Sequence, residues 1–278
     1  MHRKRRRRII ALVTDLGDRS MFGFFRPSSC PCDPAAKAWL EKRLRWLSEQ
    51  FEDSAFSGLP VVLPTRHFFP DPYDGSQASV RRMLDRVCRY MDVEPDRVVL
   101  KLVSRAGKVE MVNDAGRYLP DAAGTYRPSG ENSVITIDRA DLDQPINLVG
   151  TMAHELAHVR LLGERRIKSS VFDNELLTDL TVVFMGLGIF LANSPRAWHS
   201  QLSKWPGTTL NKPEYMTAPM YAYALAHLAW FRDEPRPAWA KHLLWHFRPE
   251  FRQALRYLWQ TGDSSFQPTG TVRERAER

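Results

Sequence analysis

SVITIDRADLDQPINLVGTMAHELAHVRLLGE, residues 133–164, begins with the pattern of a β-strand and ends with that of an amphipathic helix. Its first six residues form a short β-branched run of the kind that strands favour. After Asp143, Pro145 stands near a helix start, and apolar residues then recur at helical spacing. The stretch therefore joins a mixed α/β part of the chain to a part that is mainly helical.

Upstream of this stretch, the sequence predicts two helices and a sheet. Asp33-Pro34 is an N-cap followed by the residue best suited to the first helical turn, and this helix is expected to end near Glu52. A second helix is expected over Gln77–Met91. Short β-branched runs then predict a small, mostly antiparallel sheet, with its last turn at Pro128-Ser129-Gly130. The expected strands are residues 97–103, 108–112 and 133–138.

Downstream, apolar periodicity predicts that most of the chain is helical. The expected helices are Asn147–Gly163, Asp173–Asn193, Ala218–Phe231 and Pro237–Thr261. The fold class is therefore α+β, with a small sheet followed by a mainly helical C-terminal half. We expect four regions: a basic disordered arm or upstream extension over 1–20, a mixed α/β region with an edge strand over 21–143, a helical region over 144–262, and a polar tail over 263–278.

The net charge of +8 is concentrated at the N-terminus of the 278-residue chain. Residues 1–20 contain seven Lys or Arg and two Asp, a net charge of +5, which leaves an ordinary balance for the rest. This arm is a solvated basic tail, a nucleic-acid-binding arm, or sequence upstream of a natural start at Met21. An export signal is not expected, because only five apolar residues follow the basic run where about seven to fifteen are needed.

Cysteine usage and hydropathy predict a cytoplasmic protein. Cys30, Cys32 and Cys88 cannot form a full disulfide framework, and reduced thiols are the expected state. The most apolar stretch, residues 180–192, is shorter than the roughly twenty residues that span a bilayer, so no transmembrane segment is expected.

The segment HELAH, residues 154–158, has the residue types and spacing of a metal site. On a helix, His154 and His158 project from one face with Glu155 beside them. Two imidazoles on adjacent turns can bind one Zn²⁺, and a nearby carboxylate can take a proton from the water that the metal activates. The composition of the chain gives one chance occurrence in roughly a hundred such sequences.

The direction of the two histidines on the helical wheel supports this interpretation. The apolar arc, made of Leu148, Val149, Met152, Leu156 and Val159, lies on the side opposite His154. Leu161 shares the face of the histidines, which indicates that this face is covered as well. Such a helix, covered on two sides, suits an interior metal site.

A second pair of carboxylates follows in NELLTD, residues 174–179. Glu175 and Asp179 are four residues apart and lie on one face at the head of a strongly apolar helix. Buried carboxylates need cationic or hydrogen-bonding partners, and metal and imidazole are the obvious ones.

Over these two motifs the chain resembles the gluzincin metallopeptidases, the thermolysin-like group. The resemblance covers about 35 to 50 residues. It implies a zincin-like fold in which His154, His158 and Glu175 bind one Zn²⁺, Glu155 is the general base and Asp179 hydrogen-bonds a ligand histidine. It also implies that an edge strand before the active-site helix pairs with an extended substrate, and SVITID is the expected strand.

The third metal ligand and the group that stabilises the oxyanion both stay open. The linker between His158 and Glu175 is shorter than usual, and Glu164 is the alternative metal ligand because it occupies the third-ligand position of metzincin-like proteins. Leu161 stands where those proteins need a glycine. Candidates for stabilising the oxyanion or contacting substrate are Tyr221, Tyr223 and His227.

The function expected from the sequence is a zinc-dependent peptidase that acts on a peptide or protein substrate. The alternative is a non-catalytic, zinc-stabilised binding or regulatory protein that retains the HExxH site. Nucleic-acid binding is expected only through the Arg-rich arm, because no nucleic-acid-binding motif accompanies it. An ordinary helix that binds no metal is the remaining interpretation.

Overall fold

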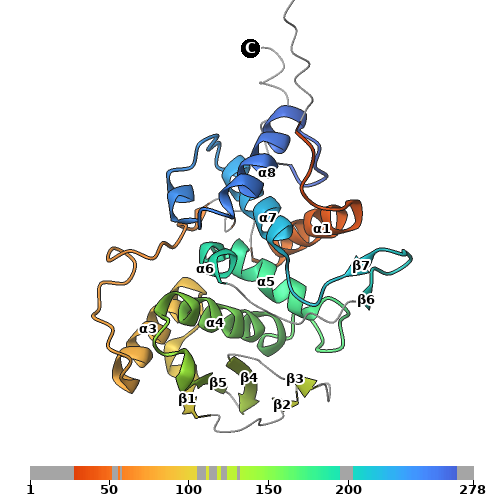
Figure 1. The fold of residues 1–278 in the computed structure, drawn as a ribbon. Coiled ribbons are helices and arrows are strands. Elements are labelled where there is room, and N and C mark those ends of the chain that lie inside the picture. The colour runs from red at the N-terminus through yellow and green to blue at the C-terminus, as the bar shows by residue number, and fades with distance from the viewer. Residues whose placement is uncertain are drawn as a thin grey trace, which may run out of the picture.

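The computed structural model describes residues 28–51, 56, 58–104, 111–112, 118–119, 124–129, 132–194 and 203–267. These residues form a mixed α/β fold around a hydrophobic core (Figure 1). The expected basic arm, Met21 and residues 268–278 lie outside the described ranges.

Helix α1, Pro34–Phe51, begins where the sequence predicts. Asp33 Oδ1 accepts hydrogen bonds from the backbone N–H groups of Ala35 and Ala36 at 3.0 and 2.9 Å, which caps the first turn. Three leucines at helical spacing face the core and are fully buried: Leu40, Leu44 and Leu47. The expected end near Glu52 lies outside the described residues.

Helix α3, Gln77–Tyr90, ends one residue before the expected position. Ser76 caps it by accepting a hydrogen bond from the Ser79 N–H at 3.3 Å. A short 3₁₀ turn, η1 (Pro95–Arg97), then leads into the first strand.

The sheet has three strands in the order β1-β5-β4, comprising β1 (Val98–Val103), β5 (Asn132–Asp138) and β4 (Gly124–Ser129). β5 pairs parallel with β1 and antiparallel with β4, so the expectation of a mostly antiparallel sheet is wrong for one of its two pairings. The sequence also predicts a turn where β4 has Pro128. This residue is tolerated because β4 is an edge strand, where a missing N–H breaks no second ladder.

The position of β5 corrects a second expectation. SVITID lies in the middle of the sheet, between β1 and β4, and is therefore not the edge strand. Within the described part of the chain, β4 has its second edge unpaired. A separate two-stranded ladder pairs β2 (Met111–Val112) with β3 (Tyr118–Leu119), so the expected strand over 108–112 is described only at its end.

The 3₁₀ turn η2 (Arg139–Asp141) connects β5 to α4, Pro145–His158. The expected helix over 147–163 does not stay α-helical to its end, because the five residues of η3, Val159–Gly163, form a π-helical turn. π-Helical turns inside or after α-helices are frequent at functional sites, since they re-aim the side chains on either side.

The expected helix over 173–193 is two helices, α5 (Asn174–Phe184) and α6 (Gly188–Asn193). The break lies at Gly186, whose φ of +86° is a left-handed conformation that favours glycine. A Cβ at this position would lie 2.4 Å from the carbonyl oxygen of Pro60, and the Gly186 carbonyl accepts a hydrogen bond from Val62 N at 2.9 Å. Close packing against the 60–62 segment therefore ends α5.

A buried carboxylate ties α1 to the start of α5. Asp173 is 1% exposed and accepts hydrogen bonds from Trp39 Nε1 at 2.6 Å and from Arg43 Nε and Nη2 at 2.7 and 2.8 Å. This bidentate arginine pair compensates the burial of the charge.

Helix α7, Ala218–Phe231, has the expected bounds. The expected helix over 237–261 is divided into a 3₁₀ turn, η4 (Ala238–His242), and α8 (Arg248–Thr261). The loop between them is held by Asn193, whose side chain donates to the His242 carbonyl at 2.7 Å and accepts from Leu244 N at 2.9 Å. A two-stranded hairpin, β6 (Ser203–Lys204) and β7 (Asn211–Lys212), precedes α7.

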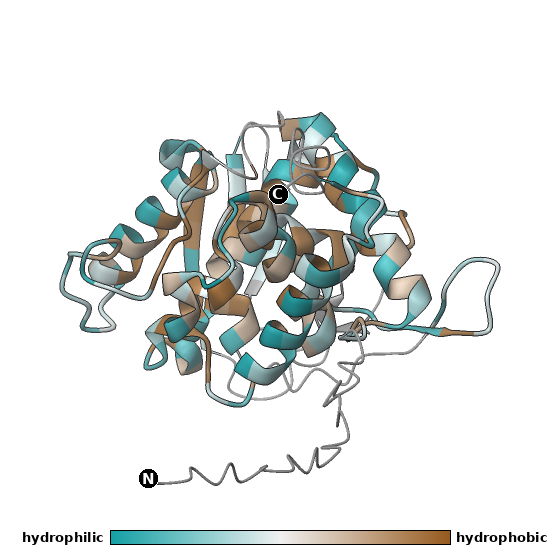
Figure 2. Ribbon diagram, turned by 90° about the horizontal axis from the view of Figure 1, so that it is seen from above, coloured by the Kyte–Doolittle hydropathy of each residue, from teal (hydrophilic) through white to brown (hydrophobic). Residues whose placement is uncertain are grey.

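The elements are stacked in layers, with the sheet at one end and α8 at the other (Figure 1). α4 contacts β4 and α3 on one side and α5 and α6 on the other, while α7 lies between α5 and α8. α1 comes from the predicted mixed region but packs against α5 and α7 of the helical part. Hydrophilic and hydrophobic residues alternate along the outer helices (Figure 2). None of the helices in the described residues has the length and apolar character needed to cross a membrane.

Candidate metal centre

The two histidines of HELAH lie on α4, on the side that faces α5. His154 is 4% exposed and His158 is 8% exposed. The opposite side of α4 is packed into the core through Leu148, Val149, Met152 and Leu156, all buried. Both faces of the helix are therefore covered, as the wheel predicts.

Glu175, in the first turn of α5, approaches both histidines with the same oxygen. Its Oε2 lies 3.2 Å from His154 Nε2 and 3.4 Å from His158 Nε2. The three potential ligand atoms all lie within 4.8 Å of one another. This group of His154, His158 and Glu175 could hold a metal ion.

The two distances to Glu175 Oε2 are close to those that one small ion requires. Ligand atoms about 2.1 Å from a tetrahedral Zn²⁺ are separated from one another by about 3.4 Å. The two Nε2···Oε2 distances, 3.2 and 3.4 Å, match this separation. Two nitrogens and one carboxylate oxygen leave a fourth position for a water or a substrate, as in catalytic zinc sites.

Asp179 orients the first histidine. Its Oδ1 lies 2.9 Å from His154 Nδ1, and its Oδ2 accepts a hydrogen bond from Met216 N at 3.0 Å. Because a carboxylate only accepts, Nδ1 of His154 donates to Asp179, and Nε2 is the ring nitrogen that faces Glu175. Nε2 is therefore the nitrogen left to bind a metal, as in carboxylate–histidine–metal arrangements.

Thr178 has the same effect on the second histidine. Its hydroxyl donates its single hydrogen to the Asn174 carbonyl at 2.9 Å, so its oxygen accepts from His158 Nδ1 at 3.3 Å. Nε2 of His158 is then also the ring nitrogen directed at Glu175. The sequence analysis did not single out Thr178, although its position three residues after Glu175 could have placed it beside the histidines.

Glu175 is held as a carboxylate. Burial raises its pKa, but the opposing effects of His158 and His154, as charges and as hydrogen-bonding partners, outweigh burial and keep this pKa well below the ordinary value. Asn174 Nδ2 donates to its other oxygen, Oε1, at 3.3 Å. An ionised carboxylate is the form that binds a metal.

Two tyrosines that no sequence motif indicates border the site. Tyr126, on β4, stacks on His158 with ring centroids 6.3 Å apart and an interplanar angle of 18°. Tyr215, 8% exposed, lies against His154 with centroids 6.0 Å apart. They come from segments far from α4 in the sequence, and only the fold brings them to the histidines.

Glu155 lies on α4 beside the ligand histidines and is 5% exposed. A cavity of about 530 Å³ opens at the adjoining π-helical turn, where Tyr126, Val159 and Gly163 are among its lining residues. The Tyr126 hydroxyl would lie 3.1 Å from a Cβ at Gly163, so a side chain there would meet the tyrosine. Tyr126 therefore lies between this cavity and His158, whereas the two histidines and Glu175 are not among the residues that line it.

Glu164, the alternative ligand, lies elsewhere. Its side chain forms ion pairs with Arg160 at 3.0 Å and Arg166 at 2.8 Å, and it is 36% exposed. The π-helical turn separates it from His158, and it is not part of the group formed by the histidines and Glu175.

Two of the oxyanion candidates have other partners. Tyr223 is fully buried and donates to Glu41 Oε1 at 2.7 Å, while His227 Nε2 lies 2.9 Å from Ser264 Oγ. Burial raises the pKa of Tyr223, and burial lowers the pKa of His227 to about 4. Both belong to a polar network that joins α7 to α1 and to the segment after α8. Tyr221 is 5% exposed on the same helix.

Comparison of the chain with known protein families, with curated proteins and with solved structures finds no match. The resemblance to gluzincins therefore rests on the two motifs and on the geometry of the cluster that they form.

Proposed function

We propose that the protein is a zinc-dependent peptidase that hydrolyses peptide bonds at the His154, His158 and Glu175 cluster. The observation that carries this proposal is the convergence of two Nε2 atoms on one carboxylate oxygen, at the separations that a tetrahedral ion needs. An ordinary helix with two surface histidines would not have both Nδ1 atoms paired and both Nε2 atoms directed at a partly buried carboxylate.

Each residue of the cluster has a defined part in this proposal. A Zn²⁺ ion in such a site lowers the pKa of a water molecule and polarises the carbonyl to be attacked. Glu155 takes a proton from the attacking water as the C–O bond forms, and passes it to the leaving amine as the C–N bond breaks. Asp179 and Thr178 keep the two histidines in the tautomer that leaves Nε2 free.

β4 is the strand that suits an extended substrate. It is the sheet edge that contacts α4, and it carries Tyr126 against His158. An extended peptide that paired with the unpaired edge of β4 would run beside the cluster, with specificity set by the side chains lining the adjoining cavity. This role replaces the one that the sequence analysis gave to SVITID.

The metal can be tested separately from catalysis. Zinc content is measured in protein purified without a histidine tag, for the wild type and for the variants Glu175→Ala and Glu164→Ala. We expect about one zinc per chain in the wild type and in Glu164→Ala, and loss of zinc in Glu175→Ala. Zinc loss in Glu164→Ala with retention in Glu175→Ala would assign the third ligand to Glu164. Absence of zinc from the wild type, with no binding on zinc addition, would refute the metal site.

Catalysis is tested with Glu155→Gln, which removes the proton acceptor but keeps the size of the side chain. Zinc-loaded wild type and variant are incubated with a broad library of peptides, and new amino termini are detected. We expect hydrolysis by the wild type and a loss of at least about a hundredfold in the variant. A zinc-loaded wild type that cleaves none of the library would favour the alternative, a zinc-stabilised binding or regulatory protein.

A further inference from the structure

A groove between η4 and α8 is lined by basic side chains and by no acidic one. Its volume is about 790 Å³, within the range of ligand sites. We call it the basic groove. Its five basic residues are Arg236, Lys241, Arg248, Arg252 and Arg256.

Four of these cations lack an ion-pair partner in the part of the chain that the structure describes. Within the residues that the structure describes, Arg236, Lys241, Arg252 and Arg256 form no ion pair, and all four are exposed. The fifth, Arg248, donates from Nε to the Leu243 carbonyl at 2.8 Å and from Nη2 to the Lys241 carbonyl at 2.7 Å. The groove therefore concentrates positive charge that would attract an anionic partner.

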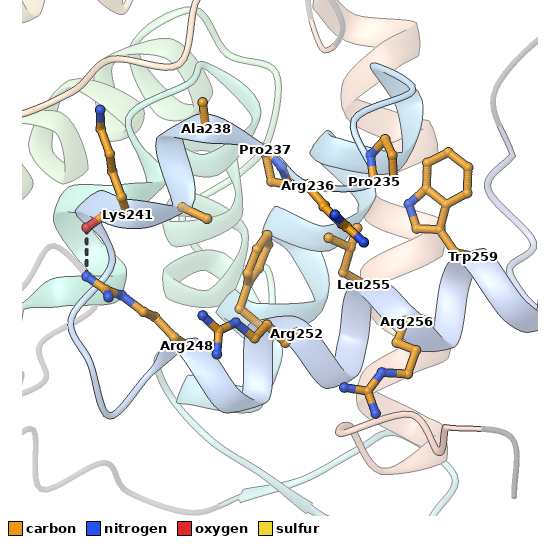
Figure 3. Close-up of a pocket in the computed structure, with 12 residues that line it drawn as sticks. Pro235, Arg236, Pro237, Ala238, Lys241, Arg248, Arg252, Leu255, Arg256 and Trp259 are labelled. Atoms are coloured by element: carbon orange, nitrogen blue, oxygen red, sulfur yellow. Dashed lines mark hydrogen bonds between the residues drawn. The ribbon is translucent and has the colours of Figure 1, made fainter. Parts of the chain in front are cut away.

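The spacing of the arginines on α8 indicates the form of that anion. Arg248, Arg252 and Arg256 recur every fourth residue and follow one another along the helix (Figure 3). Four residues of α-helix advance about 6 Å. Side chains of alternate residues in an extended peptide are about 6.7 Å apart, so a strand with an acidic residue at every second position presents carboxylates at nearly the same interval.

The remainder of the groove is apolar. Phe251, Leu255 and Ala238 line it together with the basic residues. Trp259 and Pro235 lie at one end (Figure 3). Trp and Arg are the side chains most often responsible for binding energy at protein interfaces. An occupant should therefore carry apolar as well as acidic side chains.

A protein segment fits this surface better than a single-stranded nucleic acid. Nucleic acids of that kind bind by stacking successive bases on several exposed aromatic faces. The groove offers one, because Phe251 is 2% exposed and Trp259 is the remaining aromatic residue in the lining.

We infer that the basic groove is a docking site for an acidic segment of another protein, bound in an extended conformation. Its carboxylates pair with the arginines of α8, and an apolar side chain packs against Leu255 and Trp259. Because α7 lies between α8 and α5, this surface is separate from the metal cluster. The inference does not depend on the proposed hydrolysis.

The probe is a fluorescein-labelled peptide of about eight residues in which Glu alternates with Leu and Ser, long enough to span α8 from Arg248 to Trp259. Its binding to the full chain is measured by fluorescence anisotropy in the Glu155→Gln background, which prevents cleavage. The same peptide with Lys in place of Glu is the charge control. We expect binding of the Glu peptide only, weakening as salt is added.

The groove variant is Arg252→Glu with Arg256→Glu, and the matched control is Arg82→Glu with Arg89→Glu on α3. Both pairs are exposed arginines, and both variants change the net charge equally. We expect the dissociation constant to rise at least about tenfold in the groove variant and to change less than about threefold in the control. Trp259→Ala should weaken binding about tenfold as well.

Equal binding by the groove and control variants would overturn the inference, as would failure of the folded wild type to bind the peptide. A thymidine oligonucleotide of equal charge is measured in parallel. If it bound more tightly than the peptide and lost binding in the groove variant, the groove would be a nucleic-acid site and the inference would be wrong. Circular dichroism checks folding, and Arg252→Gln with Arg256→Gln replaces the charge reversal if that variant unfolds.

Discussion

Asp179 is 0% exposed and divides its two oxygens between an imidazole and a backbone amide. At the scale of single residues, this carboxylate and the Thr178 hydroxyl decide which histidine nitrogens are available to a metal. The helical period predicts that Asp179 shares a face with Glu175, but not which of its neighbours each oxygen reaches. Tertiary packing brings His154, on α4, and the backbone amide of Met216 to the two oxygens of Asp179.

Asp179→Asn should weaken zinc binding by about ten- to a hundredfold. The amide keeps the volume but loses the charge that favours the proton on His154 Nδ1. Competition against a chelator of known affinity measures the effect. Asp233→Asn, an exposed substitution in the turn after α7, is the matched control and should leave zinc affinity unchanged. Equal affinity of Asp179→Asn and wild type would show that Asp179 does not orient the ligand.

Thr178→Val should lower zinc affinity about tenfold with the fold retained. Valine has nearly the shape of threonine but leaves the buried His158 Nδ1–H without an acceptor, which costs about 1–3 kcal/mol. The same chelator competition reports the change. Thr181→Val is the control on the same helix, because the Thr181 hydroxyl bonds only the Leu177 carbonyl at 2.7 Å. A similar loss in both variants would indicate a general effect on α5.

At the scale of elements, the boundaries of the helices are set by contacts that lie far away in the sequence. The apolar periodicity over 173–193 is continuous, so it predicts one helix where α5 and α6 are two. The backbone at Gly186 turns because the 60–62 segment packs against it. In the same way, the sheet edge beside α4 is β4 and not SVITID, since pairing order depends on the whole sheet.

Gly186→Ala should destabilise the protein by about 3 kcal/mol, from the left-handed conformation together with the clash against Pro60. Gly207→Ala is the matched control, because Gly207 has a φ of +74° but nothing within 4 Å of the added Cβ. It should cost only about 1–2 kcal/mol. Denaturant unfolding gives both free energies, and equal losses would contradict the packing explanation for the end of α5.

At the scale of the whole molecule, α7 lies between two sites with different chemistry. One is the cluster of His154, His158 and Glu175 at α4 and α5, and the other is the basic groove at α8 and η4. A buried polar network also closes the helical end, where Glu41 accepts from Tyr223 and from Ser265 N at 2.8 Å. The expected polar tail over 263–278 therefore starts with a packed segment, residues 263–267, in which Ser264 and Phe266 are buried.

This network predicts that stability falls in two steps with acid. Burial lowers the pKa of His227 to about 4, so the unfolded chain binds the extra proton and stability decreases as pH falls from about 6.5 to about 4. For Glu41, burial raises the pKa, but hydrogen bonds from Lys37, Ser265 and Tyr223 outweigh it and lower the pKa from 4.5 to about 2. Its contribution is therefore present above pH 4.5 and is lost as pH falls toward 2.

Unfolding of the metal-free protein in denaturant, measured at a series of pH values, checks both steps. Glu41→Gln should destabilise the protein by about 2–3 kcal/mol at pH 7 and remove the lower step while leaving the upper one. His227→Gln should remove the upper step. A wild type whose stability is constant between pH 7 and pH 4 would contradict the assignment of His227.

The sequence by itself determined which side chains share one face of a helix. His154, Glu155 and His158 share a face, as do Glu175 and Asp179, because 3.6 residues per turn dictates it before any tertiary contact forms. Tertiary structure alone decided which carboxylate meets the histidines, which strand borders them, and that Thr178, Tyr126 and Tyr215 join them. The reason is that these contacts connect segments whose separation in space depends on the packing of the whole core, and local periodicity carries no information about that distance.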